Sequence, residues 1–144
     1  MTRTTILLFS LMLTNSAFGQ VSLGYYPFQS EVSITSNSEL RVWGDFRVAT
    51  NTFFGNMTTE PILMINVKRK EVVNVYTGLG LNLNFFNDVY GYSILNGYTM
   101  HVGARVKPFK SMKNIQGIFE LSPYVRPDFD GGLLRSRLGI AYQF

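Results

Sequence analysis

The sequence predicts an all-β fold, an up-and-down antiparallel transmembrane β-barrel of eight strands with a polar, filled interior. Three observations predict it. Apolar and polar residues alternate with a period of two along most of the chain, which places them on opposite faces of strands. No stretch beyond the N-terminal segment has a convincing helical period. The chain has no cysteine, so disulfides cannot supplement a small core, whereas a closed barrel in lipid satisfies its own backbone.

The first residues are expected to be a secretory signal peptide. Arg3 supplies positive charge, Ile6–Leu13 is a short apolar core, and Ala17-Phe18-Gly19 is a small-x-small cleavage site. The apolar run is too short to span a membrane as a helix. We therefore expect a signal peptide over residues 1–19 and a single barrel domain over residues 20–144.

The N-terminal part of that domain leaves the strand count open. Val21–Tyr26 and Phe28–Thr35 flank Pro27, which cannot donate to a strand ladder. They are either two short strands or one bent strand. Single-chain bacterial barrels have even strand numbers, so one bent strand would require an eighth strand hidden in residues 85–95.

The following strands are clearer, and six segments are expected to form them: Glu39–Thr50, Pro61–Val67, Val72–Asn84, Asn96–Val106, Ile115–Arg126 and Leu133–Phe144. The turns 68–71 and 107–114 contain all five lysines. They should lie at one end of the barrel, with the longer loops 51–59, 85–95 and 127–132 at the other. Short inner turns and longer outer loops are typical of transmembrane barrels.

Charged side chains within the strands indicate which face is inside. Five arginines lie on the polar faces of predicted strands, whereas the lysines are confined to turns. A confined polar interior favours arginine, because the planar guanidinium group can pair with both oxygens of a carboxylate. The predicted interior network is Arg41, Asp45, Arg47, His101, Arg105, Glu120, Arg135 and Arg137. Two acids cannot balance five arginines, so tyrosine, asparagine, water or a bound anion is expected to help.

Small residues occupy the same polar face, among them Gly78, Gly80, Gly103 and Gly139. An eight-stranded barrel has only enough interior for side chains to fill it. Glycine at these positions would leave room for arginine and tyrosine side chains from facing strands.

The last strand ends in Tyr142-Gln143-Phe144. With the signal peptide and the alternating cysteine-free strands, this ending resembles small bacterial outer-membrane β-barrel proteins of the eight-stranded type. The resemblance implies a location in the outer membrane, contact with outer-membrane lipids, and recognition of Tyr142 and Phe144 by the barrel assembly machinery. It marks a class of protein and implies no specific activity.

Catalytic and metal chemistry is weakly supported. His101 is the single histidine and cysteine is absent, so a histidine cluster for a metal is impossible, and no cofactor is expected. A catalytic triad would need His101 with Ser93 or Ser122 and with Glu120 or Asp45. The inward position of His101 in mid-strand favours interior packing.

The expected role is therefore that of a non-enzymatic membrane barrel with a structural or surface-interaction role. Its loops 51–59, 85–95 and 127–132 would face outward. The alternatives are a lipid-modifying outer-membrane enzyme, a narrow channel and a soluble exported ligand-binding barrel. The basic run Lys68-Arg69-Lys70 is interpreted as a turn near anionic lipid headgroups and not as a nucleic-acid patch.

Overall fold

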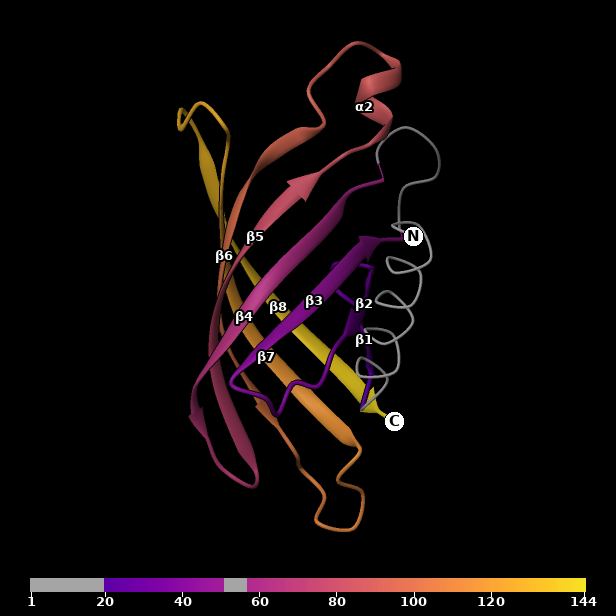
Figure 1. Cartoon of the computed structure of the whole chain (residues 1–144), viewed down its shortest axis with the longest axis vertical. Coiled ribbons are helices and arrows are strands. Elements are labelled where there is room, and N and C mark those ends of the chain that lie inside the picture. Colours follow the sequence, from indigo (N-terminus) through magenta and orange to yellow (C-terminus); the bar gives the residue numbers. More distant parts are fainter. Residues whose placement is uncertain (1–19, 51–56) are drawn as a thin grey trace, which may run out of the picture.

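The computed structural model describes residues 20–50 and 57–144. They form one closed barrel in which each strand pairs antiparallel with its neighbours in sequence and the last strand pairs with the first (Figure 1). The strands are β1 (Ser22–Tyr26), β2 (Glu31–Thr35), β3 (Val42–Ala49), β4 (Thr59–Arg69), β5 (Val73–Leu83), β6 (Leu95–Val106), β7 (Ile115–Val125) and β8 (Gly132–Gln143). The predicted eight-stranded up-and-down barrel is confirmed. The predicted signal peptide 1–19 and residues 51–56 of the first predicted loop lie outside the described residues.

The segments on either side of Pro27 are two separate strands. β1 and β2 pair over five positions, from Ser22↔Thr35 to Tyr26↔Glu31. The turn between them is tight, because the amide of Gln29 donates to the carbonyl of Tyr26 at 3.3 Å. No extra strand is therefore needed in residues 85–95, where the chain instead forms the short helix α2 (Phe86–Val89) before β6 begins.

Two of the differences between the observed and the predicted strand boundaries change the position of a charged residue. β3 begins at Val42, so Arg41 precedes the strand instead of lying within it. β4 begins at Thr59, so Thr59 belongs to the strand and not to the predicted loop 51–59, and Glu60 belongs to the strand as well. Pro61 lacks the N–H that a ladder needs, and the β4–β5 register accordingly passes from Thr59 directly to Ile62.

The two faces of the barrel wall have opposite composition. Among the described residues, the buried set contains seven hydrophobic residues but twenty polar or charged ones. In β8 the alternation is regular, with Arg137, Gly139, Ala141 and Gln143 buried between exposed neighbours. The hydrophobic side chains thus point mainly away from the barrel axis, which is the reverse of an ordinary soluble domain.

Two glycines show why the inner face needs small residues. A Cβ added at Gly103 would lie 2.7 Å from the hydroxyl oxygen of Tyr76, and one at Gly139 would lie 2.7 Å from the ring of Tyr26. Tyr26 and Tyr76 are both fully buried. The space beside these glycines is filled by tyrosine rings that cross the interior.

The connections sort to the two ends as predicted wherever they are described. The β4–β5 and β6–β7 turns and the C-terminus lie at the lower end in Figure 1. Helix α2 and the β7–β8 turn lie at the upper end. Among the described residues, no helix is long and apolar enough to span a membrane.

The barrel wall ends lower on the side where β8 meets β1 than on the side where β8 meets β7. Pairing of β8 with β1 stops at Tyr25↔Ile140, whereas its pairing with β7 continues up to Gly132. Among the described residues, the upper half of β8 therefore has a strand neighbour on one side only. At this free edge, the side-chain amide of Gln29 donates to the carbonyl of Ser136 at 2.7 Å.

Candidate functional site: the charged barrel interior

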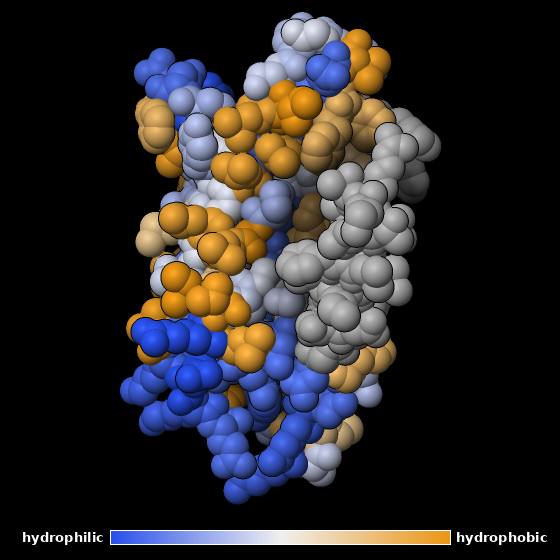
Figure 2. All heavy atoms as spheres, viewed as in Figure 1, coloured by the Kyte–Doolittle hydropathy of each residue, from blue (hydrophilic) through white to orange (hydrophobic). Residues whose placement is uncertain are grey.

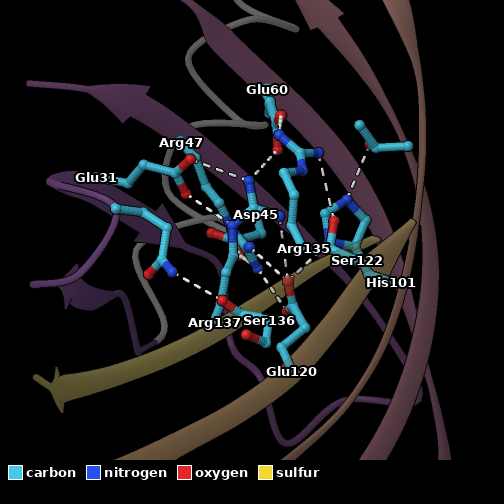
Figure 3. Close-up of polar contacts among 12 residues, drawn as sticks. Glu31, Asp45, Arg47, Glu60, His101, Glu120, Ser122, Arg135, Ser136 and Arg137 are labelled. Carbon is cyan, nitrogen blue, oxygen red and sulfur yellow. Dashed lines mark hydrogen bonds and ion pairs between the residues drawn. The ribbon is translucent and has the colours of Figure 1, made fainter. Parts of the chain in front are cut away.

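The centre of the interior is an ion pair between opposite parts of the wall (Figure 3). The guanidinium of Arg47 on β3 donates to both carboxylate oxygens of Glu120 on β7, at 2.7 and 2.8 Å. The hydroxyl of Tyr76 donates to Glu120 at 2.7 Å, and Nδ1 of His101 lies 2.8 Å from the same carboxylate. Period-two alternation brings these side chains together, since each lies at an inward position of its strand.

A second group of contacts extends from this centre toward the lower end. Nε of Arg47 donates to Asp45 at 2.9 Å, and the hydroxyl of Thr35 donates to the other oxygen of Asp45 at 3.0 Å. Arg105 donates to the hydroxyl oxygen of Thr35 at 3.1 Å. Its guanidinium also lies over the ring of Trp43, 4.7 Å from the centroid, which is a favourable cation–π distance.

A third group extends toward the upper end. Arg137 donates to both oxygens of Glu31, at 2.9 and 3.0 Å, and to Glu60 at 2.9 Å. Arg135 donates to Glu60 at 2.7 Å, as does the amide of Asn82 at 2.7 Å. Glu60 on β4 therefore receives hydrogen bonds from two other strands, β5 and β8.

The interior charges balance. Of the described residues, those in this network are the cations Arg47, Arg105, Arg135 and Arg137 and the acids Glu31, Asp45, Glu60 and Glu120. With His101 counted as neutral, four positive charges meet four negative charges. Burying charge is tolerable only when each group has partners, and each of these eight side chains has at least one hydrogen-bond partner.

Seven of the eight residues predicted for the interior network lie in it, and one does not. Arg41 is exposed, just before β3, so its assignment to the interior is corrected. The carbonyl of Arg41 accepts from the amide of Asn66 at 2.9 Å. This bond holds the backbone against β4 and leaves the side chain outside the barrel.

Sequence reasoning missed two acids of the network, Glu31 and Glu60. Glu31 is the first residue of β2, and its alternation with Val32 and Ile34 already placed it on the polar face. Glu60 directly precedes Pro61, which obscured the start of β4. The excess of arginine over acid was itself a signal that further inward carboxylates were to be found.

Of the residues considered for a catalytic triad, His101 and Glu120 are in contact, but among the described residues no hydrogen bond joins a serine to His101. The ring nitrogens of His101 contact Glu120 and the hydroxyl of Thr99, at 2.8 and 2.9 Å. Ser122 contacts Arg135 instead, at 3.4 Å. Within residues 20–50 and 57–144, no group of His, Cys, Asp and Glu side chains is suited to hold a metal ion.

Tyr142 and Phe144 lie together on the outside of the barrel at the lower end. Their rings are in edge-to-face contact with centroids 5.0 Å apart, and both side chains are exposed. They form a compact aromatic feature that is separate from the interior network.

Comparisons with protein families, with curated proteins and with solved structures found no match for this chain. Chemically, the interior network links β2, β3, β4, β7 and β8 by charge-assisted hydrogen bonds, which are stronger than neutral ones. Its side chains occupy the space where a lumen would lie, so the arrangement is suited to bracing a barrel wall.

Proposed function

We propose that this chain is an integral outer-membrane β-barrel protein with a structural or surface-interaction role. The observation that carries the proposal is the reversed burial of the wall: charged side chains are inside and large apolar side chains are outside. Such a wall is stable when its outer face contacts lipid. In water, the same wall would expose an apolar surface far larger than ordinary monomers present.

The outer apolar residues form a continuous surface over the middle of the strands. Leu63 pairs with Leu79 and Leu79 pairs with Met100 on adjacent strands, and the exposed fractions of Leu63 and Leu79 are 60% and 70%. Figure 2 shows apolar residues over the middle of the visible wall and hydrophilic residues gathered at its lower end. This distribution supports a lipid-facing belt bounded by polar ends.

The free edge of β8 is consistent with that placement. Unpaired backbone groups are not tolerated within the hydrocarbon region. The segment 132–139 lies beyond the described pairing with β1, and the side chain of Gln29 covers the carbonyl of Ser136. We therefore place the part of β8 above Ser136 at the upper interface or above it. The apolar belt then lies below this height.

The filled interior favours a structural role over transport. Arg47, Glu120 and Arg137 occupy the middle of the barrel, and their side chains are at most 1% exposed. An eight-stranded barrel has no spare lumen once such side chains fill it. We place the upper loops, including 85–95 and 127–132, on the cell surface, where they would carry any recognition of partners.

The lower end is proposed to face the periplasm. The resemblance of the last strand to outer-membrane barrels makes the exposed pair Tyr142 and Phe144 the expected contact for the assembly machinery. The lysine-rich turns 68–71 and 107–114 would lie beside anionic headgroups of the inner leaflet.

The membrane proposal is tested by folding and by labelling. Protein folded in detergent should migrate differently on a denaturing gel before and after boiling, and it should float with phosphatidylcholine vesicles. Identical mobility together with failure to float would refute a lipid-embedded barrel. Discrete conductance in planar bilayers would favour the channel alternative instead.

Orientation is tested in cells with single cysteines, because the native chain has none. Asp128→Cys in the β7–β8 turn should react with a membrane-impermeant maleimide added outside intact cells. Lys110→Cys in the β6–β7 turn should react only after the envelope is opened. The opposite pattern would reverse the orientation.

A further inference from the structure

The net charge of the barrel is concentrated at one end. The interior is neutral, as shown above, and the upper end carries Asp88, Asp128 and Asp130 against Arg126. The lower end carries seven cations, Arg41, Lys68, Arg69, Lys70, Lys107, Lys110 and Lys113, against the two acids Glu39 and Glu71. Among the described residues, the positive charge of the protein therefore lies almost entirely at the lower mouth.

A cavity of about 730 Å³ opens at this mouth. Its charged lining is Glu39, Arg69, Lys70, Glu71, Lys107 and Lys113. The volume is within the range of small-molecule sites. The charged lining of this open cavity has four cations against two acids.

The floor of the cavity is built from amide side chains. Asn74 and Gln143 line it and are 8% and 7% exposed. Gln143 accepts from the amide of Gln116 at 2.7 Å and donates to Gln20 at 3.1 Å. This chain of hydrogen bonds holds the side chain of Gln143 in place at the floor of the cavity.

The acids of the lining leave part of the positive charge unbalanced. Glu39 forms an ion pair with Lys107, and Glu71 lies 3.4 Å from Lys113. Within the part of the chain that the structure describes, the one hydrogen bond of the Arg69 side chain is to the backbone carbonyl of Glu39, at 3.2 Å. The side chain of Lys70 has no hydrogen-bond or ion-pair partner among the described residues.

We propose that this lower-mouth cavity, defined by Arg69, Lys70, Asn74, Lys107, Lys113 and Gln143, binds a phosphate-bearing small molecule. Phosphate oxygens accept charge-assisted hydrogen bonds from guanidinium and ammonium groups. The planar guanidinium of arginine can donate two parallel hydrogen bonds to one phosphate group. The amides of Asn74 and Gln143 offer further donors at the floor. The cavity opens along the barrel axis, so it favours a soluble phosphate compound over a lipid headgroup, which would have to reach over the rim.

The test uses the full barrel, labelled with ¹⁵N, in phosphatidylcholine nanodiscs. Inorganic pyrophosphate should shift the side-chain amide signals of Asn74 and Gln143 in a saturable way, whereas sodium chloride at the same ionic strength should not. Lys70→Gln should weaken pyrophosphate binding about tenfold, since one charge-assisted hydrogen bond is lost. Lys68→Gln is the matched control, because Lys68 carries the same charge nearby and does not line the cavity.

The outcomes separate the possibilities. Equal weakening by Lys68→Gln and Lys70→Gln, or no saturable shift in the native chain, would overturn the site. Phosphatidylglycerol nanodiscs without pyrophosphate distinguish the source of the phosphate: shifts at Asn74 and Gln143 there would assign it to a lipid headgroup. Gel mobility before and after boiling shows that each variant is folded, so a loss of binding is not a loss of the barrel.

Discussion

The Arg47 guanidinium and the Glu120 carboxylate form a bidentate ion pair with N–O distances of 2.7 and 2.8 Å, although the two residues are 73 positions apart in sequence. Both side chains are at most 1% exposed. A buried pair of this kind is not in itself strong stabilisation, because desolvation offsets much of the attraction. The pair matters for stability when one partner is removed, because the other charge is then left buried without compensation.

Removing one member of this pair should destabilise the barrel strongly. Arg47→Met leaves the Glu120 carboxylate buried without its main partner, and we expect a loss of roughly 3–5 kcal/mol in the free energy of unfolding. Glu120→Gln should cost a similar amount. Equilibrium unfolding in urea, with the protein in phosphatidylcholine vesicles, measures both.

The double variant is the control for a direct interaction. Arg47→Met combined with Glu120→Gln should lose less than the sum of the two single losses, because no charge of the pair is left alone. Strictly additive losses would show that the two residues act independently, contrary to the contact described.

A glycine on the inner face gives a second prediction. A Cβ at Gly139 would lie 2.7 Å from the ring of Tyr26 and 3.1 Å from the carbonyl of Tyr25. Since Tyr26 is fully buried, Gly139→Ala should destabilise by roughly 1–3 kcal/mol through overpacking. Gly117→Ala on the adjacent strand is the control, because its nearest neighbours would lie 3.9 Å away. Equal stability of the two variants in urea would contradict the packing described.

Period-two alternation was sufficient to predict the barrel, since each strand has one polar and one apolar face. It also predicted most of the interior, because Asp45, Arg47 and Glu120 sit in the middle of strands where the period is regular. It failed where strands begin. Arg41 and Glu60 lie at or just beyond strand ends, and a terminal position carries no periodic signal of its own.

The pairing of interior charges could not be predicted at all. Arg137 bonds Glu31 and Glu60, which belong to strands far from it in sequence. Such partners are decided by the closure of the barrel and by the relative height of the strands. Alternation gives the direction of a side chain but not its height, so the charge balance emerges only from the three-dimensional arrangement.

The outer belt gives a third prediction, with a control at an equally exposed site. Leu79 in β5 and Val89 in α2 are 70% and 79% exposed. If the wall contacts lipid, Leu79→Arg should impair folding into vesicles by roughly 2–4 kcal/mol, whereas Val89→Arg at the upper end should have little effect. Folded fractions from gel mobility measure the difference. Similar folding of the two variants would place the wall in water.

The fourth prediction concerns the upper half of β8, whose backbone groups alternate between two neighbours. The amide of Phe144 donates to Val21 beside β1, whereas the amide of Gln143 donates to Asn114 beside β7. Continuing this alternation upward, the amides of Arg135 and Arg137 point to β7.

The amides of Leu134 and Ser136 then point to the free edge, where pairing with β1 has ended. In hydrogen exchange followed by NMR, these two amides should therefore exchange much faster than those of Arg135 and Arg137. Ile140, which points to the same side but is paired with Tyr25, is the internal control and should exchange slowly. Uniform protection along β8 would mean that another segment covers this edge in the folded protein.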